Sequence, residues 1–362
     1  MMKKLLIAVI VLIAAFGASA QFRTRNVILV TLDGARHQEI FAGLDRELYP
    51  KIYRNGTDRE TFRKFDAPDA KQRRAKLMPF FWETLVRSRG SIAGNLARAS
   101  KVETTNNLLF SYPGYSEIVT GRARDDVIRS NDRVQNKFPS FLQFLQRKMN
   151  LDRNGVAVFG SWNVFNEIVT TDPNAFVVNA GYENSESSDP QIRSFNELQN
   201  EAPTPWDSVR HDFYTFSFAM DHLRTHHPRV LYIALGETDD WAHDKNYDRM
   251  IDALHRTDSY LKKLFDFIDS DPQYRDKTTV IITADHGRGS TENDWNSHGE
   301  EVPEARNIWM AFVSPDWKQR GEWSKSTIYQ NQVAATLTKV LGYDYSEQDN
   351  EAGKPIGLLF KR

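Results

Sequence analysis

The sequence predicts an α/β fold in which a mostly parallel central sheet is flanked by helices on both faces. Short segments rich in Val, Ile and aromatic residues alternate along the chain with longer segments whose apolar residues recur at helical spacing. Several of the short segments are apolar without interruption, which is typical of strands buried on both faces of a sheet. Strands that alternate with helices in this way indicate a parallel sheet with helices on each side.

Residues 1–20 are interpreted separately, as a secretory signal peptide. Two lysines give the segment a basic start, Leu5–Phe16 is an apolar stretch too short for an ordinary membrane span, and the segment ends in Ala-Ser-Ala, a cleavage-site pattern. We therefore expect an exported protein, periplasmic or secreted, whose mature chain begins at Gln21 and has no membrane partner after cleavage. An uncleaved membrane anchor is the alternative.

The composition of the chain excludes several classes of site. The 362 residues include 47 Lys and Arg against 48 Asp and Glu, which argues against bulk nucleic acid as the main partner. Because cysteine is absent, a thiol nucleophile and a thiolate zinc site are excluded, and any transition metal must be held by His and carboxylate. With 40% hydrophobic residues the chain can form a large core, and we expect residues 21–362 to form a single catalytic domain.

The individual elements follow from these patterns in chain order. Enrichment in Val, Ile and aromatic residues predicts strands at Val27–Thr31, Val156–Phe159, Phe176–Asn179, Val230–Leu235, Val280–Thr283 and Trp309–Val313. Apolar residues at helical spacing predict helices at Arg73–Arg89, Ser140–Met149, Trp206–Thr225, Tyr247–Ile268 and Ser326–Leu341, the last with Gly342 as its C-cap. The polar stretches 45–76 and 181–205 are expected to be loops or inserted caps, which near strand ends often shape a substrate pocket.

Carboxylates and imidazoles follow three of the expected strands, and a further histidine lies in a glycine-flanked loop. One such residue usually means a helix cap or a turn. Their combination at several strand ends instead indicates a site for two metal ions, which need mixed imidazole and carboxylate ligands and leave room for a substrate. The spacing Asp-x-x-x-His also places both side chains on one helical face. The six candidate ligands are Asp33, Asp239, His243, Asp285, His286 and His298.

Ser111 is the candidate nucleophile, in the segment Asn106–Arg122. A serine hydroxyl is a weak nucleophile by itself, but a divalent ion bound to its oxygen lowers the hydroxyl pKa and makes an alkoxide accessible. A turn or N-cap serine is the alternative, and for Ser111 taken alone it is the favoured one.

Taken together, these motifs resemble the alkaline phosphatase superfamily, most closely its phosphodiesterase/nucleotide pyrophosphatase and related phosphatase branches. The resemblance spans roughly Asn26 to Leu341. Its motifs are moderately specific singly and strongly specific in this order. They are Leu32-Asp33-Gly34, Ser111-x-Pro113 with Thr120-Gly121, Asp239-x-x-x-His243, Ala284-Asp285-His286-Gly287, His298-Gly299 and the C-terminal helix that carries Gln332–Leu337.

The resemblance implies a hydrolase of phosphoric esters with two Zn²⁺ ions, other divalent ions being possible. It implies one ion at Asp33, Asp285, His286 and the Ser111 oxygen, and the other at Asp239, His243 and His298. Ser111 would attack phosphorus and form a phosphoseryl intermediate that water hydrolyses. Asn131 is the nearest candidate for the asparagine with which these enzymes bind a phosphoryl oxygen, and a simple turn in Ser130-Asn131-Asp132 is the alternative.

Three further residues near these motifs are predicted to contact a small phosphoester substrate: Arg36, Tyr112 and Tyr115. Whether the substrate is a monoester or a diester is left open. A monoester enzyme would need basic side chains for the extra phosphate charge, and the candidates for that role are Lys101, Arg122, Arg124 and Arg129.

A sulfatase is the close alternative, since sulfatases share the expected fold and the Ser/Cys-x-Pro register. They need an arginine where this chain has Tyr115, and they use calcium with paired aspartates at the first strand, where this chain has Asp33-Gly34. Three imidazoles among the candidate ligands also favour zinc over calcium. A phosphotransferase or mutase, and a non-catalytic binding protein on the same scaffold, are the remaining alternatives.

Overall fold

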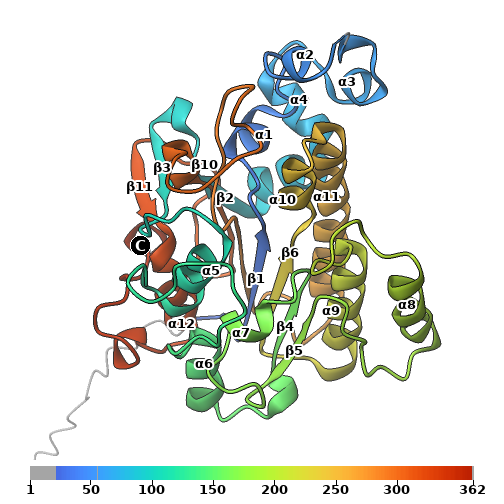
Figure 1. The fold of residues 1–362 in the computed structure, drawn as a ribbon. Coiled ribbons are helices and arrows are strands. Elements are labelled where there is room, and N and C mark those ends of the chain that lie inside the picture. Colours follow the sequence, from blue (N-terminus) through green and yellow to red (C-terminus); the bar gives the residue numbers. More distant parts are fainter. Residues whose placement is uncertain (1–21, 55, 361–362) are drawn as a thin grey trace, which may run out of the picture.

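The centre of the molecule is a sheet of eight strands in the order β10-β2-β9-β7-β1-β6-β4-β5 (Figure 1). The structure is a computed structural model that describes residues 22–54 and 56–360, so the predicted signal peptide, residues 1–20, lies outside the described residues. The strands of this sheet are β1 (Asn26–Leu32), β2 (Gly90–Ala93), β4 (Val156–Gly160), β5 (Val177–Ala180), β6 (Val230–Leu235), β7 (Thr278–Thr283), β9 (Met310–Val313) and β10 (Gly321–Glu322).

The sheet is mostly parallel, as the sequence predicts. Strands β7, β1, β6, β4 and β5 all run in the same direction, and β9 is antiparallel to both of its neighbours. Strand β1 lies between β6 and β7, with Val27 paired to Val230 on one side and to Thr279 on the other. The carboxyl ends of these three strands therefore meet at one edge of the sheet, and each is followed by predicted metal ligands.

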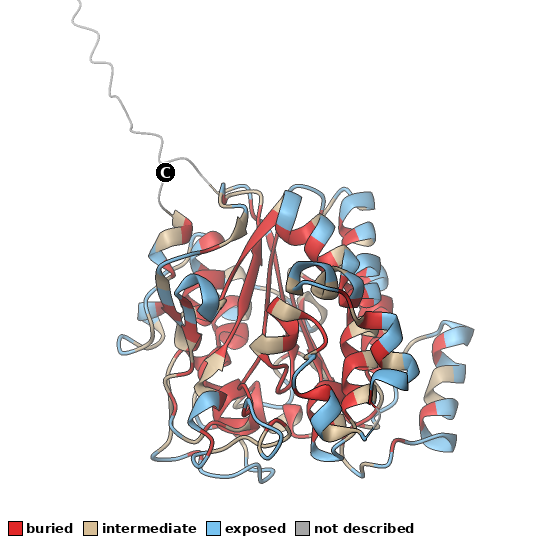
Figure 2. Ribbon diagram, turned by 90° about the horizontal axis from the view of Figure 1, so that it is seen from above, coloured by how far each residue is buried: buried red, intermediate tan, exposed pale blue. Residues whose placement is uncertain are grey.

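Helices cover both faces of the sheet (Figures 1 and 2). In Figure 1, α5, α6 and α12 group on one side of the strands, and α9 and α11 lie on the other. The α-helices are α1 (His37–Ala42), α2 (Tyr49–Ile52), α3 (Glu60–Phe65), α4 (Ala70–Leu77), α5 (Ser111–Thr120), α6 (Phe141–Met149), α7 (Phe165–Ile168), α8 (Pro190–Glu201), α9 (Asp212–His226), α10 (Glu237–His243), α11 (Tyr247–Ser270) and α12 (Val333–Val340). A π-helix, η2 (Phe81–Arg89), precedes β2.

All six predicted strands are present, but the sequence pattern misses five short ones of two to four residues: β2 and β10 of the central sheet, and the three strands of a second sheet. A second sheet has the order β11-β3-β8 and consists of β3 (Ser100–Glu103), β8 (Asn307–Ile308) and β11 (Ser326–Tyr329). Residues 326–329 were predicted to start the last helix, and this is wrong. They pair in parallel with β3, where Ile328 lies opposite Val102, and α12 begins only at Val333. This pairing with a distant segment overrides the local helical pattern.

Two predicted helices differ from the structure: one is interrupted, and the other begins later than predicted. The helix expected over Arg73–Arg89 is interrupted after α4, because Pro79 has no backbone N–H and its ring clashes with the preceding helical turn. The chain restarts as η2, where the Asp258 carboxylate accepts the N–H groups of Phe80 at 3.0 Å and Phe81 at 2.7 Å. The helix expected from Trp206 begins only at Asp212, as α9.

The two polar stretches also contain helices. Residues 45–76 carry α2, α3 and most of α4, which lie together with α1 at the top of Figure 1. Residues 181–205 carry α8, which packs on α9 through Phe195 and Phe213, whose ring centroids lie 5.0 Å apart. The sequence holds a signal for this helix, since Asp189 caps it and Pro190 occupies its first position.

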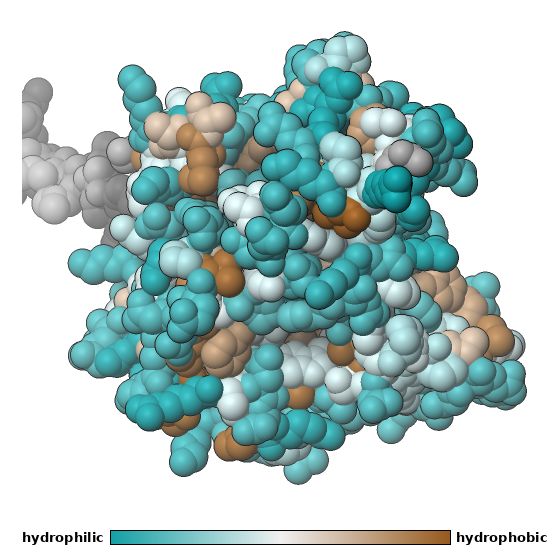
Figure 3. Space-filling model, turned by 45° about the horizontal axis from the view of Figure 1, so that its top comes forward, coloured by the Kyte–Doolittle hydropathy of each residue, from teal (hydrophilic) through white to brown (hydrophobic). Residues whose placement is uncertain are grey.

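Apolar residues gather inside the molecule and are sparse on its surface. The buried residues of the strands and of the inner helix faces form the large core coloured red in Figure 2. The face in Figure 3 is mostly hydrophilic, with apolar groups scattered over it, which is ordinary for a folded protein. Within residues 22–54 and 56–360, none of the helices combines the length and the apolarity that a membrane crossing requires.

Candidate metal centre

Five of the six predicted ligands form two overlapping groups at the carboxyl ends of β1, β6 and β7. Asp33 follows β1, Asp285 and His286 follow β7, and Asp239 lies on α10, directly after β6. One group consists of Asp33, Asp285 and His286, and the other of Asp239, His286 and His298, with ligand atoms within 4.8 Å of one another in each group. The sixth ligand, His243, lies against the second group.

His286 joins the two groups and is oriented as a ligand. The side chain is fully buried, and its Nδ1 lies 2.9 Å from the carbonyl oxygen of Gly287. Because Nδ1–H donates to that carbonyl, Nε2 carries the lone pair. Nε2 lies 3.4 Å from Asp33 Oδ1 and 3.4 Å from Asp285 Oδ2. Both of these oxygens are buried and have no hydrogen-bond partner among the described residues, so a cation between them is the partner that they lack.

The other oxygen of each aspartate is held by the protein. Asp33 Oδ2 accepts the hydroxyl of Tyr115 at 3.0 Å, and Asp285 Oδ1 accepts the N–H of Gly34 at 3.0 Å. Gly34 has a φ of +54°, and a Cβ atom there would lie 2.4 Å from Asp239 Oδ1. The glycine of the Leu-Asp-Gly motif is therefore required both by its backbone conformation and by the close approach of a ligand.

His243 contacts two members of the second group, Asp239 and His298. His243 Nε2 lies 3.0 Å from Asp239 Oδ2 and 3.0 Å from His298 Nε2. His298 Nδ1 donates to the carbonyl of Leu109 at 3.2 Å, so its Nε2 lone pair faces the other ligands. Two ring nitrogens and a carboxylate oxygen converge here, which is a donor set suited to zinc.

Arg288 is a residue of the site that sequence reasoning missed. Its buried guanidinium forms an ion pair with Asp239 Oδ1 and donates to the Asp239 backbone carbonyl at 3.1 Å. The signal that could have revealed it is its position directly after the His286-Gly287 motif. Arg288 supplies positive charge behind a ligand and fixes the orientation of its carboxylate.

Burial and mutual repulsion shift the pKa values of the ligands. Burial raises the pKa of Asp33 well above its usual range, and the charge of Asp239 adds to this. Burial likewise raises the pKa of Asp285, with Asp33 adding to the shift. Burial works in the same sense on Asp239, but Arg288 and His243 outweigh it and hold that pKa well below its usual range. Burial, with the neighbouring His286, lowers the pKa of His298 to about 2, which leaves a neutral imidazole ready to act as a ligand.

Ser111 lies next to the ligands, at the first position of α5. The side chain is 6% exposed, and its Oγ lies 3.4 Å from His286 Nε2. The N-terminal N–H groups of a helix favour anions. Asn131 is beside this helix start, where its Oδ1 accepts the N–H of Tyr112 at 2.9 Å. An open hollow of about 280 Å³ lies here, lined by Phe110, Ser130, Asn131, His298 and Gly299.

The three predicted substrate contacts lie elsewhere. Arg36 is fully buried, and its guanidinium is bound by Glu39 at 2.8 and 2.5 Å and by the carbonyl of Gly289 at 2.9 Å. Tyr112 is 2% exposed, with its hydroxyl on the carbonyl of Val134. Tyr115 is 1% exposed and holds Asp33. None of the three lines the hollow beside Ser111, and the contacts of their side chains are with other parts of the protein.

The basic candidates for a second phosphate charge are engaged elsewhere too. Arg124 pairs with Asp349 at 2.5 Å, Arg122 pairs with Glu351, and Lys101 lies 3.6 Å from Glu103. Arg129 donates to the carbonyl of Asp125 at 3.1 Å. None of the four lines the hollow beside Ser111.

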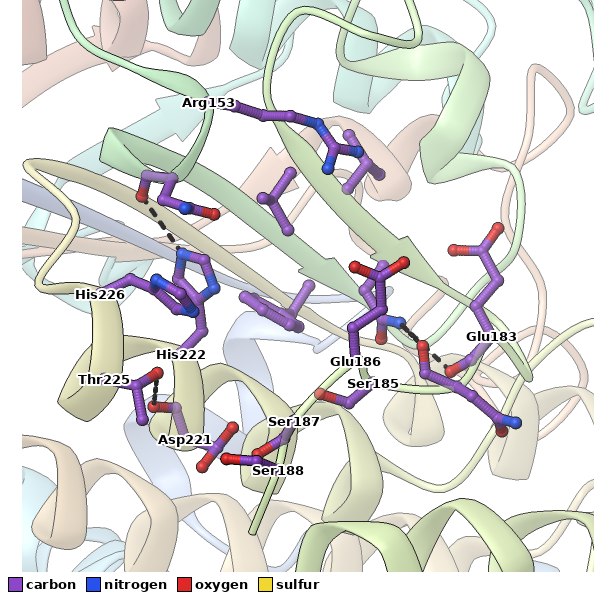
Figure 4. A pocket seen from close by; sticks show the side chains of 16 residues that line it. Arg153, Glu183, Ser185, Glu186, Ser187, Ser188, Asp221, His222, Thr225 and His226 are labelled. Carbon is purple, nitrogen blue, oxygen red and sulfur yellow. Dashed lines mark hydrogen bonds between the residues drawn. The ribbon is translucent and has the colours of Figure 1, made fainter.

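A large cavity lies at the edge strand β5, and neither candidate metal group of the described residues lies in it (Figure 4). Its volume is about 750 Å³, and it runs between β5, the segment 183–188 and α9. His222 and His226 line it, with ring centroids 4.5 Å apart and the ring planes tilted by 32°. Size alone would select this cavity, but the convergent ligands and the hydroxyl of Ser111 lie at the central strands.

Comparison with known proteins agrees with this fold. Residues 214–336, which contain the last five predicted ligands, match the family model described as Metalloenzyme superfamily. No curated protein sequence matches the chain significantly.

Three solved structures illustrate the likeness in fold. Phosphonate monoester hydrolase SpPMH from Silicibacter pomeroyi gives a TM-score of 0.57 at 12% identity, covering 94% of this chain and 77% of that one. A mutant of the alkaline phosphatase PafA gives a TM-score of 0.56 at 10% identity, covering 94% and 99%. A 2-O GAG sulfatase gives a TM-score of 0.51 at 12% identity, covering 92% and 72%. The alkaline-phosphatase-like fold and the resemblance to this metalloenzyme superfamily are therefore confirmed.

Proposed function

We propose that the protein is an exported, zinc-dependent hydrolase of phosphoric esters that acts through Ser111. The placement of Ser111 carries this proposal: its Oγ lies 3.4 Å from His286 Nε2, at a helix N-terminus and against both ligand groups. The fold is shared with proteins described as phosphatase, phosphonate hydrolase and sulfatase, which fits ester hydrolysis as the reaction class.

Two Zn²⁺ ions fit the donor set of the site. Asp33, Asp285 and His286 would hold one ion, and Asp239, His243 and His298 the other. Imidazole together with carboxylate favours zinc among the common divalent ions, and other divalent ions fit the same ligands less specifically. When bound, the ions would supply positive charge that polarises a phosphoryl oxygen and stabilises a serine alkoxide.

The residues of the chain then have defined roles in hydrolysis. Ser111 Oγ forms a bond to phosphorus while the bond from phosphorus to the leaving alcohol breaks, and the serine proton ends on that alcohol. The oxygen of water then bonds to phosphorus while the Oγ–P bond breaks and a water proton restores the hydroxyl; the product is phosphate from a monoester and a phosphate monoester from a diester. Asn131 lines the hollow, and its Oδ1 is held by the Tyr112 N–H, so its amide NH₂ group would be the donor to a phosphoryl oxygen. Positioning and charge supply most of the rate increase in such reactions.

Parallel assays of three esters with the zinc-loaded protein test this proposal. We expect turnover of para-nitrophenyl phosphate or bis-para-nitrophenyl phosphate, and the ratio between them separates monoesterase from diesterase activity. A chelator should abolish the turnover, and added zinc should restore it. Dominant turnover of para-nitrophenyl sulfate would favour the sulfatase alternative, and no turnover of any ester would count against the hydrolase.

Tyr115→Phe is expected to weaken zinc binding without removing it. The change deletes only the hydroxyl that holds Asp33 Oδ2, and loss of such a support typically lowers metal affinity about 10-fold or more. Calorimetric titration of the metal-free variant with Zn²⁺ measures the effect. Tyr112→Phe is the matched control, because its hydroxyl bonds to the carbonyl of Val134. Equal affinities in the two variants would remove Tyr115 from this role.

Export predicts the mass of the mature protein. If the signal peptide is cleaved after residue 20, intact-mass analysis of protein from the periplasm or the medium of a bacterial host should give a chain that begins at Gln21. A product that retains residues 1–20 and sediments with membranes would instead support the uncleaved anchor.

A further inference from the structure

The segment that leads into α5 is organised around one buried carboxylate, Glu117. This side chain lies within α5 and is fully buried. Its oxygens accept the N–H and hydroxyl of Thr105, each at 2.9 Å, and the N–H and side-chain amide of Asn106, each at 2.8 Å. No Lys, Arg or His in the described part of the chain forms an ion pair with Glu117, so these hydrogen bonds are what compensates its burial.

Asn106 connects Glu117 to Leu109 through two hydrogen bonds of its side chain. The Asn106 side chain is fully buried, and while its NH₂ group donates to Glu117, its Oδ1 accepts the N–H of Leu109 at 2.9 Å. Leu109 has a φ of +55°, the left-handed conformation that costs a branched residue about 1–3 kcal/mol. Backbone strain of this kind persists only where surrounding contacts enforce it, and Asn106 supplies such a contact.

The conformation of Leu109 determines the orientation of a metal ligand. Its carbonyl oxygen accepts the N–H of Gly299 at 2.9 Å and Nδ1–H of His298 at 3.2 Å. The second of these bonds selects the tautomer of His298 that leaves Nε2 free, directed at His243 and Asp239. Proteins usually fix the tautomer and orientation of a metal-ligating imidazole in this way, with a hydrogen bond from its other ring N–H to an acceptor.

We propose that Glu117, Asn106 and Leu109 form a relay, the Glu117 relay, that positions His298 from the same helix that carries Ser111. Glu117 lies six positions after the proposed nucleophile on α5, so one helix fixes both the hydroxyl and the orientation of a ligand of the second ion. The inference deepens the proposed function and rests on it in treating His298 as a metal ligand. Glu117, Asn106 and Leu109 are positioning residues that act through His298.

The tautomer of His298 in metal-free protein is the first test. Nitrogen-15 labelling of the histidines separates Nδ1–H from Nε2–H imidazoles by chemical shift, and the His298 signals are identified by their loss in His298→Gln. We expect a single Nδ1–H tautomer in the wild type and a mixture in Asn106→Ala. Asn107→Ala is the matched control, because it removes the same group one residue away, where the side chain contacts Asp125 and Arg306.

Zinc titration is the second test, and its result is separate from enzyme activity. We expect Asn106→Ala to weaken one of the two zinc sites by about 10–100-fold and to leave the other unchanged, as for loss of a group that supports a ligand. Glu117→Gln should act in the same direction, because an NH₂ group would then face the N–H donors of Thr105 and Asn106.

The outcomes separate failure of the relay from failure of the proposed function. A wild type that binds no zinc would contradict the proposed function, while the tautomer comparison in metal-free protein would still test the relay. An unchanged His298 tautomer in folded Asn106→Ala, or the same change in Asn107→Ala, would overturn the relay. If circular dichroism shows that both Asn106→Ala and Glu117→Gln fail to fold, the segment has a purely structural role and the proposal is also overturned.

Discussion

Ser111→Ala is expected to lower phosphoester turnover by about 10³-fold or more, which corresponds to roughly 4 kcal/mol or more of lost transition-state stabilisation. The reason is chemical, because the substitution removes the oxygen that would bond to phosphorus. The fold should tolerate the change. Among the described residues the Ser111 hydroxyl has a single hydrogen-bond partner, His286 at 3.4 Å. No side chain caps the start of α5, and alanine is the best helix former.

Zinc content measured beside turnover makes this experiment specific. The variant should retain its metal, because the aspartate and histidine ligands are intact. Ser116→Ala, on the same helix, is the control. Its buried hydroxyl accepts only a weak contact from Asn136 at 3.4 Å, so turnover there should stay close to wild type. Wild-type activity in Ser111→Ala would remove Ser111 from the mechanism.

Asp285→Asn is expected to abolish turnover for a different reason, and at the same time to stabilise the metal-free protein. Asp285 Oδ2 is buried with no hydrogen-bond partner among residues 22–54 and 56–360, and the charge of the neighbouring Asp33 acts on this carboxylate. A neutral amide of the same shape would retain the bond to the Gly34 N–H and relieve the repulsion. A buried polar group without a partner costs about 1–3 kcal/mol of folding stability, and we expect the metal-free variant to recover a free energy of this order. The zinc site, however, loses a charged ligand.

Thermal unfolding with and without zinc measures both effects. The wild type should gain stability when zinc is added, because a ligand that binds only the folded state stabilises it. Asp285→Asn should begin with a higher melting temperature when metal-free and gain much less on adding zinc. Asp269→Asn is an exposed control, since that carboxylate pairs with Arg89 at the surface and surface pairs contribute little. A metal-free Asp285→Asn that is less stable than wild type would contradict the charge argument.

The central strands and their ligands could be predicted because local pattern and tertiary role agree there. Strands β1, β6 and β7 are rich in Val, Ile and Leu and buried along their whole length, and each is followed within a few positions by a carboxylate that a strand end does not require. Strands β3 and β11 could not be predicted in this way. They are four residues long and partly exposed, and their pairing with each other depends on residues more than 220 positions apart.

The direction in which a side chain points could not be predicted from the sequence either. Arg36 and Tyr115 lie close to ligand motifs in the sequence, but proximity does not tell whether a side chain faces a substrate or the interior, and both face the interior. Asn131 is the opposite case, a residue that is distant from Ser111 in the sequence but lies beside it in the structure. The segment between α5 and Asn131 is irregular, so it has no helical or strand periodicity from which this position could be predicted. Its place beside Tyr112 appears only once the chain has folded back.

The position of β1 between β6 and β7 has a kinetic consequence. The first strand of the described chain pairs with Val230 on one side and with Thr279 on the other, so it cannot enter the sheet until most of the polypeptide has been synthesised. Closing such long loops is slow compared with forming local helices. The N-terminal strand therefore pairs late, and the candidate metal centre that Asp33 shares with Asp239, Asp285 and His286 is completed only when β6 and β7 are in place.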